Sequence, residues 1–171
     1  MPALVPPDPA LHPSFSEAVA EFLAEGVNPD HYRAELRDRP SFDEWLLVLA
    51  DEGRPDAKPR FEGWVPQTTL WWIEGEEYLG RVAIRHRLSE PLLRFGGHIG
   101  YDVRPSARRR GHATAMLAAS LPIARELGIE SALVTCDHDN IGSRKVIEAN
   151  GGEPDVPNSV KLRYWVPTGR R

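Results

Sequence analysis

The sequence predicts an α/β protein of the α+β kind, in which helices flank a mixed sheet and an N-terminal helical segment comes first. At 171 residues the chain has room for one domain with a substantial core. Its 41% of apolar and 27% of charged residues are typical of a globular protein. Beyond about residue 65, helical hydrophobic spacing gives way to strand-like alternation, and strands and helices then follow each other.

The N-terminal region contains two helical patterns. The first covers residues 14–26, where apolar residues recur at helical spacing before Gly26. The second begins at Ser41, which fits a capping box with Glu44 ahead of an apolar face.

An exposed linker follows at residues 51–59, which are rich in proline and charge. We therefore interpret residues 1–60 as an N-terminal helical extension, which can belong to the same fold. Residues 61–171 form the main domain.

Later elements follow in order along the main domain. Residues 67–74 and 78–87 form a hairpin around Gly75, and the second strand alternates as a half-exposed strand does. Further strands are expected at 97–103, 131–136 and 160–166, with helices at 111–127 and 140–150 and a connecting loop at 88–96. Pro122 is expected to kink the first of these helices or to divide it.

The composition excludes several classes of protein. No apolar run approaches the roughly 18 residues of a membrane span, and the proline-rich start does not resemble a secretory signal. The single cysteine, Cys136, excludes an intrachain disulfide and suits a reducing cytoplasm. A net charge of −4 argues against general binding to nucleic acid or membranes and mildly favours a cationic substrate.

The segment at residues 103–114 carries the strongest signal. A strand runs into a basic loop, Arg108-Arg109-Arg110-Gly111, and then directly into an alanine-rich helix. Such a junction points backbone N–H groups and the positive end of the helix dipole at one spot, and Gly111 lets a ligand approach. The pattern indicates a phosphate site; the alternative is a solvated basic turn.

A second constellation follows about 25 residues later. The strand at 132–136 leads into Asp137-His138-Asp139-Asn140, then Ser143, and then Glu148-Ala149-Asn150-Gly151-Gly152. The chain has neither of the standard nucleotide-binding loops, G-x-x-x-x-G-K-[ST] and G-x-G-x-x-G, so ATP hydrolysis and dinucleotide redox chemistry are disfavoured.

Together these motifs resemble the GCN5-related N-acetyltransferase (GNAT) superfamily. The resemblance covers residues 67–165, including Gly-Gly-His-Ile-Gly-Tyr before the loop and Asn-Gly-Gly after the last helix. It implies a twisted, mostly antiparallel sheet and acetyl-CoA as the acyl donor, with no metal.

The resemblance also implies roles for particular positions. The amides of residues 109–114 would hold the pyrophosphate, and the main chain of residues 101–103 would pair with the pantetheine arm. The thioester carbonyl would then lie near Gly100 and Tyr101, where an N–H stabilises the oxyanion. The implied cofactor-binding residues are Tyr101, Asp102, Val103, Arg108, Arg109, Arg110, Gly111, His112, Ala113, Thr114, Asn140 and Ser143. Asn140 can at the same time be a helix N-cap.

One position departs from the family. Many members have a tyrosine seven residues after that asparagine, which protonates the departing thiolate, and here the position is Ile147. Tyr101, Cys136 and His138 are the alternative donors, and the thiolate can also leave unaided. Cys136 is otherwise a buried structural thiol.

The amine needs a base, since an alkylammonium is almost fully protonated at neutral pH. We take His98 as the candidate catalytic base, beside Tyr101, because it lies on the strand that leads to the loop. The alternative is a histidine bonded inside the sheet. The three acidic residues of the hairpin turn can act through water or form a solvated turn; these are Glu74, Glu76 and Glu77.

Two further patterns are interpreted structurally. The six histidines show no metal-ligand spacing, so no metal site is expected. Trp71 and Trp72 must face opposite sides of their strand, and we expect packing roles for both, although one could line a substrate cleft.

The predicted activity is acetyl transfer from acetyl-CoA to a primary amine of a small molecule or peptide, by direct attack without an acyl-enzyme. A noncatalytic acyl-CoA sensor is the alternative, and a nucleic-acid-binding domain using the arginine cluster is a weaker one. Specificity should come from the segment before residue 67 and the loop at 88–96. Members of the family often form dimers, so a homodimer is possible.

Overall fold

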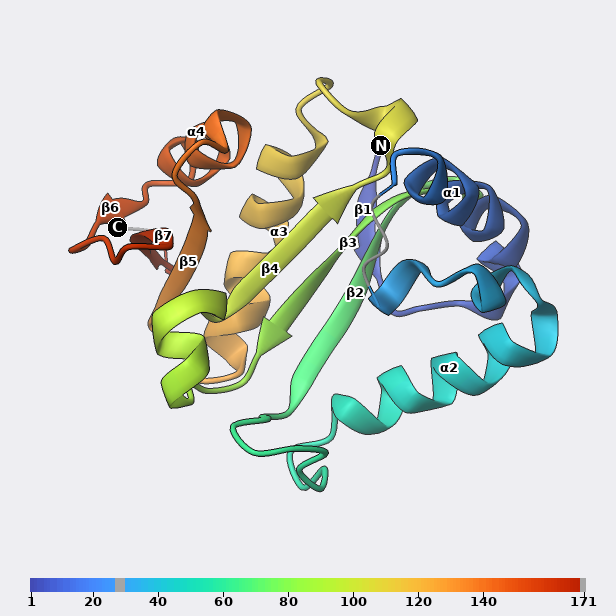
Figure 1. Ribbon diagram of the computed structural model, residues 1–171, viewed down its shortest axis with the longest axis horizontal. Coiled ribbons are helices and arrows are strands. Elements are labelled where there is room, and N and C mark those ends of the chain that lie inside the picture. The colour runs from blue at the N-terminus through green and yellow to red at the C-terminus, as the bar shows by residue number, and fades with distance from the viewer. Residues whose placement is uncertain (27–29, 170–171) are drawn as a thin grey trace.

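The computed structural model describes residues 1–26 and 30–169, which fold into two antiparallel sheets with helices packed around them (Figure 1). The first sheet has the strand order β1 (Ala3–Val5), β2 (Gln67–Glu74), β3 (Glu77–Arg85), β4 (Ile99–Val103). The second has the order β5 (Ser131–Asp137), β7 (Lys161–Pro167), β6 (Glu153–Pro154). The α-helices are α1 (His12–Ala24), α2 (Arg39–Glu52), α3 (His112–Glu126) and α4 (Ile141–Ala149).

This architecture confirms the expected fold class. The expected helices and strands also begin and end within two residues of the observed bounds. For the second helix only the start was predicted, so only its start is compared. Short helical turns were not expected; they are η1 (Pro9–Leu11), η2 (Asp30–Tyr32), η3 (Ala34–Arg37), η4 (Leu92–Gly96) and η5 (Pro105–Ala107). The π-helical turn η4 lies within the segment expected to be a plain loop. α3 runs as one helix through Pro122, so the chain is not divided there.

The N-terminal segment builds part of the first sheet. β1, which the sequence did not predict, pairs antiparallel with β2 from Ala3 opposite Ile73 to Val5 opposite Trp71. α1 and α2 pack on the same sheet through a buried aromatic cluster. Its rings include Phe15, Tyr32, Phe42, Trp71 and Tyr78.

The prediction that Ser41 is the N-cap of the second helix is wrong, because Asp38 takes that position. α2 begins at Arg39, and the side chain of Asp38 accepts a hydrogen bond from the backbone N–H of Ser41 at 3.3 Å. Pro40 lies in the first turn, where its missing N–H leaves no bond unmade. The helix therefore starts one half-turn earlier than the Ser41 signal indicates.

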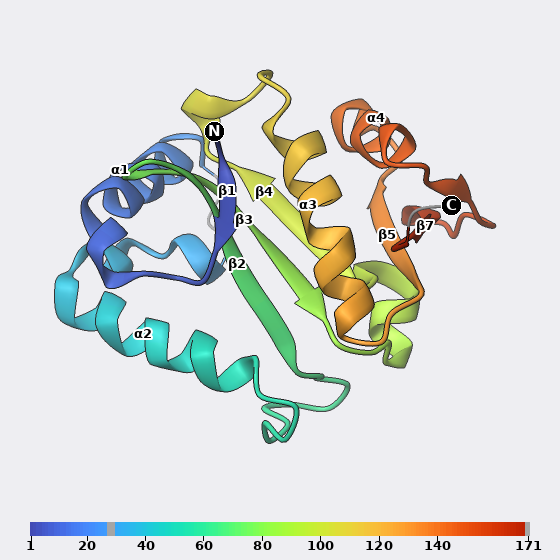
Figure 2. The same ribbon diagram turned by 180° about the vertical axis from the view of Figure 1, so that it is seen from behind.

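The two faces of the first sheet are covered differently. α3 lies across one face (Figure 2). Trp72 is buried there in the main core, the apolar cluster formed by residues of β2 to β5, β7, α3 and α4. Trp71 points to the other face and is buried in the aromatic cluster. The opposite facing of the two tryptophans is thus confirmed, and both are core residues.

The two sheets meet where β4 and β5 begin. The backbone N–H of His98 donates to Leu133 O at 2.7 Å, and the N–H of Leu133 donates to Nδ1 of the His98 ring at 2.8 Å. From there the two strands run in the same general direction and diverge (Figure 1), with no ladder between them in the described residues. One edge of β4 is therefore open.

No helix among the described residues is long and apolar enough to cross a membrane.

Candidate functional site

The loop before α3 presents a run of unsatisfied backbone donors. The N–H groups of residues 109–114 donate to no acceptor in the described part of the chain, and the first such bond is Ala115 to Gly111 O at 3.1 Å. Gly111 has φ 82° and Arg109 has φ 62°, so the loop turns these groups outward. Nothing lies within 4 Å of the position that a Gly111 Cβ would take. This anion cradle fits a pyrophosphate.

The side chain of Arg108 does not point into the anion cradle. Its guanidinium donates to Val103 O at 3.0 Å and to Glu25, the residue that directly follows α1, at 2.6 Å. Arg104, which is 6% exposed, bonds to Glu21 at 2.7 Å and Glu17 at 3.2 Å. Both arginines therefore tie the loop to α1, while the side chains of Arg109 and Arg110 are exposed and bond to no side chain in the described part of the chain.

The open edge of β4 presents alternate residues to the space beside β5. Hydrogen bonds from Arg85 N–H to His98 O and from Arg104 N–H to Leu79 O show which residues of β4 bond to β3. By the alternation of an antiparallel ladder, the main-chain groups of Tyr101 and Val103 face the open edge. Those of Asp102 face β3, where Asp102 lies opposite Arg81.

Tyr101 reaches from β4 to the start of α4. Its hydroxyl lies 2.7 Å from Oγ of Ser143, and burial raises the pKa of Tyr101 to about 12 although the Ser143 bond lowers it. Asn140 caps α4 by accepting from the N–H of Ser143 at 3.0 Å. Ile147, at the usual tyrosine position, is fully buried in the main core. The hydroxyl pair of Tyr101 and Ser143 is thus held next to the open edge.

The other two donor candidates are placed less favourably. Cys136 is 5% exposed, and burial raises the pKa of its thiol. Nε2 of His138 lies 3.0 Å from Asn158 O, which fixes the loop before β7.

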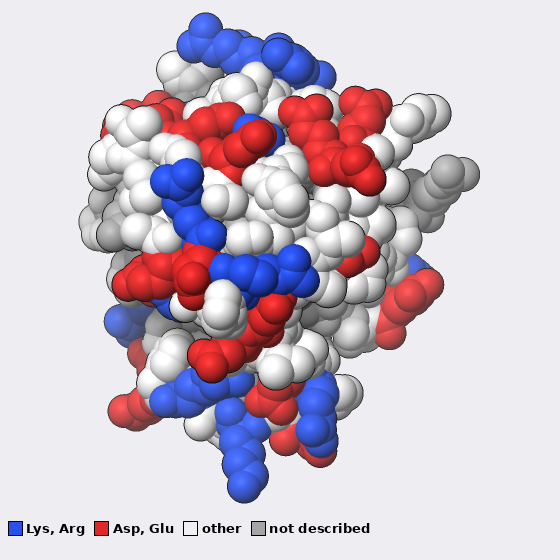
Figure 3. Space-filling view, turned by 90° about the vertical axis from the view of Figure 1, so that its right-hand side faces the viewer, with Lys and Arg blue, Asp and Glu red and all other residues white. Residues whose placement is uncertain are grey.

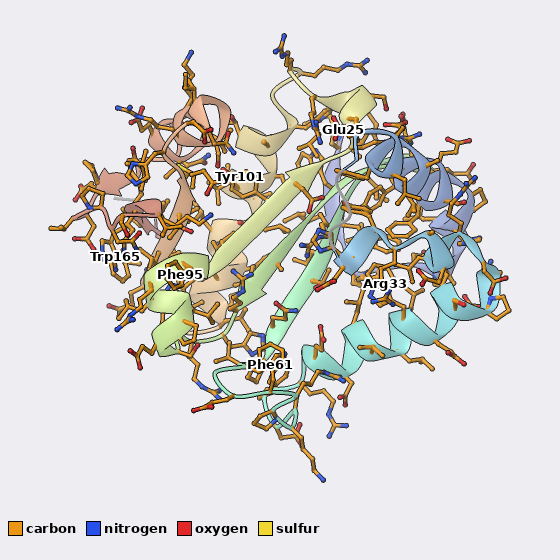
Figure 4. All side chains as sticks on the ribbon, in the orientation of Figure 1. Glu25, Arg33, Phe61, Phe95, Tyr101 and Trp165 are labelled. Atoms are coloured by element: carbon orange, nitrogen blue, oxygen red, sulfur yellow. The ribbon has the colours of Figure 1, made fainter. Side chains whose placement is uncertain are left out.

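A large cleft opens on the sheet face that α3 does not cover. Its volume is about 840 Å³, and it is lined by α2, by residues 30–35 and 60–65, and by β2 and β3. Leu92 of η4 closes it from the segment at 88–96. In Figure 4, Arg33 and Phe61 border this face from opposite ends. Both segments that were expected to set specificity therefore reach the cleft.

A buried polar network supports the wall of this cleft at Asp102. The carboxylate accepts from Arg81 Nε at 3.0 Å, from Nε2 of His31 at 2.9 Å and from the hydroxyl of Tyr32. The Tyr32 hydroxyl lies 2.6 Å from that of Tyr78. Burial opposes ionisation of Asp102, but Arg81 and the hydrogen bonds outweigh it and lower the pKa of the carboxyl.

His31 is held neutral in this network. Its Nδ1 lies 3.0 Å from Nη2 of Arg81, which is a donor only, so Nε2 carries the proton donated to Asp102. Burial is the main cause that lowers the pKa of His31, and the positive charge of Arg81 lowers it further. The hydrogen bond and the charge of Asp102 raise the pKa, but they do not outweigh the other two effects.

His98 joins the two sheets. The ring is 8% exposed, and its Nδ1 accepts from Leu133, so the nitrogen that a base would use on that side is occupied. Burial and the nearby Arg85 lower the pKa of His98 to about 4. This geometry matches the alternative of a histidine bonded inside the sheet.

The acidic hairpin turn lies outside the cleft. Glu74 pairs with the N-terminal ammonium at 3.5 Å, and Glu77 lies 4.0 Å from Arg104. Neither these residues nor Glu76 lines the cleft. No group of three or more His, Cys, Asp or Glu side chains among the described residues could hold a metal ion.

Several residues of the cleft were missed by the sequence analysis. His31, Glu52, Arg81 and Arg85 all line it. Arg81 and Arg85 lie on one face of β3 with Ala83. Two arginines on a strand face that is otherwise covered are unusual, and this pattern could have identified both as cleft residues from the sequence.

An anion cradle beside an open strand edge, with a cleft on the opposite face, defines a protein that brings an extended phosphate-bearing ligand to an acceptor. The chain belongs to the GNAT acetyltransferase family, because the family model described as acetyltransferase (GNAT) domain matches residues 9–153. It is accordingly an acyltransferase. Comparison with curated proteins finds no match.

Solved structures with the same fold include several acetyltransferases. RimJ of Mycobacterium smegmatis, described in complex with CoA-disulfide, aligns with a TM-score of 0.70 at 17% identity, over 97% of this chain and 81% of that one. RimL, a ribosomal L7/L12 α-N-protein acetyltransferase in complex with coenzyme A, gives 0.65 at 16%, over 97% and 93%. MccE, a microcin C7 self-immunity acetyltransferase in complex with acetyl-CoA and AMP, gives 0.64 at 14%, over 97% and 92%. At these identities the likeness shows the fold.

Proposed function

We propose that this protein is an acetyl-CoA-dependent N-acetyltransferase that acetylates a primary amine by direct attack. The observation that carries the proposal is the anion cradle of residues 109–114 beside the open edge of β4. The cradle supplies donors for the pyrophosphate, and the edge supplies main-chain groups for the pantetheine arm. Two structural relatives, RimJ in complex with CoA-disulfide and MccE in complex with acetyl-CoA and AMP, support this assignment.

In the proposed site, the loop before α3, the edge of β4 and the start of α4 have separate roles. Arg109 to Thr114 hold the pyrophosphate by their N–H groups, while Arg108 positions the loop through Val103 and Glu25. Tyr101 and Val103 pair with the pantetheine arm along the edge of β4. Asn140 caps α4 so that Ser143 meets Tyr101.

The acceptor amine enters from the cleft on the other face of β4. Its nitrogen forms a bond to the thioester carbon, and the N–H of Tyr101 stabilises the oxyanion. The carbon–sulfur bond then breaks, and the hydroxyl pair of Tyr101 and Ser143 supplies a proton to the thiolate. With a pKa of about 12, Tyr101 holds that proton at neutral pH. The attached nitrogen loses its extra proton to water, and water returns a proton to the hydroxyl pair, so that the products are the amide and CoA thiol.

His98 serves in this proposal as a structural joint. Its Nδ1 is occupied, and a pKa of about 4 makes it a weak base for an alkylammonium. The ammonium proton leaves to water in the cleft before attack.

The test is thermal unfolding with and without acetyl-CoA, with ATP and NAD as controls. A ligand at about 100 times its dissociation constant stabilises by about 2.7 kcal/mol, which raises Tm by roughly 5–10 °C for a chain of this size. A rise with acetyl-CoA alone supports the proposal. The absence of any rise at millimolar acetyl-CoA would overturn it.

A noncatalytic acyl-CoA sensor is the second candidate. Burial of Ile147 at the position where many relatives have a proton-donating tyrosine favours it. Release of CoA in the presence of a panel of amines separates the two, because a sensor binds acetyl-CoA without turnover.

A cytoplasmic location, the homodimer and the absence of nucleic-acid partners remain expectations. On the side of α1 and α2, acidic and basic side chains interleave over most of the face, and basic side chains gather at its upper end (Figure 3).

A further inference from the structure

Arg85 places a guanidinium in the cleft with three of its five N–H donors unused. Nη1 donates to Gly96 O at 2.9 Å and to Gly97 O at 3.3 Å. Nε and Nη2 donate to no group in the described chain, and no described carboxylate lies within 4.0 Å of Arg85. These two nitrogens form the side of the guanidinium that binds a carboxylate through two parallel N–H bonds.

The guanidinium lies directly over Gly100 of β4. The position that a Gly100 Cβ would take is 3.6 Å from Nη1 and 3.7 Å from Nη2 of Arg85. Gly100 precedes Tyr101, whose main chain faces the open edge. Under the proposed function, the acetyl group emerges at this point, so Arg85 flanks the position of the attacking amine.

The charge at this point is unbalanced. Arg81 lies on the same face of β3 but already pairs with Asp102, and His31 is neutral. Glu52 accepts from Gln67 at 3.1 Å and pairs with Arg60 at 3.4 Å. Three further carboxylates line the cleft, those of Asp30, Glu35 and Glu44, but no described carboxylate lies within 4.0 Å of Arg85. The guanidinium of Arg85 therefore has no direct anionic partner in a partly desolvated wall, and an anionic ligand group would supply one.

We propose that Arg85 binds the carboxylate of the acceptor, and that the acceptor is a free amino acid whose carboxylate lies one or two carbons from the reacting amine. The short span follows from the position of Arg85 over Gly100, where Nη1 lies 3.6 Å from the place that a Gly100 Cβ would take. The proposal rests on the proposed function and names its substrate class. It also qualifies the expectation of a cationic acceptor: the protein as a whole is acidic, but this point is positive.

The test compares each standard amino acid, and β-alanine, with its amide. CoA release gives kcat/KM for wild type and for the variants Arg85→Gln and Arg85→Lys. Wild type should prefer at least one acid over its amide by about tenfold or more, mainly through KM. Arg85→Gln, which keeps a donor for the Gly96 carbonyl, should lower this ratio to about one, and Arg85→Lys should give an intermediate ratio.

The matched control is Arg87→Gln, two residues along the chain, exposed and outside the cleft. It should keep the wild-type ratio. Equal losses for acids and amides in Arg85→Gln would assign Arg85 to the oxyanion or to the fold and overturn the proposal. So would wild-type amides as reactive as the acids, or peptides acetylated where free amino acids are not.

Binding of the products gives a readout that does not need turnover. In the presence of CoA, calorimetry should detect the N-acetylated acid and a weaker N-acetylated amide, with the difference lost in Arg85→Gln. If neither product binds although acetyl-CoA does, the inference fails and the proposed function stands. If acetyl-CoA does not bind either, the proposed function itself has failed.

Discussion

The two sides of β4 differ in the chemical groups that form them: backbone N–H groups on one side and side chains on the other. On the cofactor side, one continuous stretch, residues 109–114, forms the anion cradle almost entirely from backbone N–H groups. On the acceptor side, side chains from α2, β2, β3 and η4 line the cleft, and buried ion pairs hold them in place. A backbone cradle accepts any side chain that permits the loop conformation, whereas the cleft depends on each side chain and its partner. We therefore expect substitutions to be tolerated more readily in the side chains of the cradle than in those of the cleft.

Loss of Asp102 should have the largest effect and should fall on the acceptor side. In Asp102→Ala, Arg81 loses its half-buried carboxylate partner and His31 and Tyr32 lose their acceptor, which should lower the free energy of unfolding by about 3 kcal/mol or more. Chemical denaturation at pH 7 measures this, with Asp43→Ala, an exposed ion-pair carboxylate, costing about 0.5 kcal/mol or less. A small loss at Asp102 would show that the network does not support the cleft.

The same residue sets a pH dependence. Because the folded pKa of Asp102 lies below 3.8, its contribution is complete above that value and is lost as the pH falls below it. Asp102→Ala should therefore lack this part of the acid destabilisation of wild type.

A substitution of His98, which joins the two sheets through Leu133, tests whether this histidine is structural or catalytic. Between pH 6.5 and about 4 the unfolded chain binds a proton that the folded ring does not, so wild-type stability should fall with pH by at most about 3 kcal/mol. His98→Asn should flatten this slope and leave the shape of the pH–rate profile unchanged. A changed pH–rate profile in His98→Asn would restore His98 as the base.

Gly111→Asp should break the cofactor side alone. The side chain adds a negative charge at the cradle and occupies a backbone with φ 82°, so acetyl-CoA should bind about 30-fold more weakly or worse, about 2 kcal/mol. Gly128→Asp is the matched control, since Gly128 has φ 88°, equally open space and a place at the other end of α3. Equal affinities in the two variants, measured by calorimetry, would exclude the cradle from cofactor binding.

Tyr101→Phe should give the smallest effect, at the boundary between the two sides. Removing the hydroxyl pair should lower kcat by about tenfold, about 1.4 kcal/mol, with the KM for acetyl-CoA unchanged. Ser143→Ala should cost about the same, and the double variant no more than either alone, because the two hydroxyls act together. Unaltered kcat in both single variants would indicate that the thiolate leaves without a proton donor.

The elements were largely predictable, and the misses have physical reasons. β2 was predicted at its observed bounds because its pattern is local. β1 was missed because three residues among prolines carry no period, and only pairing with Trp71–Ile73 makes them a strand. The start of α2 was shifted because Asp38 and Ser41 both satisfy the rules for a cap, and the backbone geometry selects Asp38.

By itself, the sequence determined the class of fold, the loop of free N–H groups before α3 and the family, since each depends on residues that are neighbours along the chain. Glycine, arginine and the start of a helix create the cradle within six residues, and no distant partner is needed. Only the tertiary structure decided that His98 is occupied by Leu133, that Arg108 turns to Glu25, and that Arg85 faces the cleft with free donors. These outcomes depend on contacts between residues far apart in sequence, because the environment of a polar side chain is set by what folds against it.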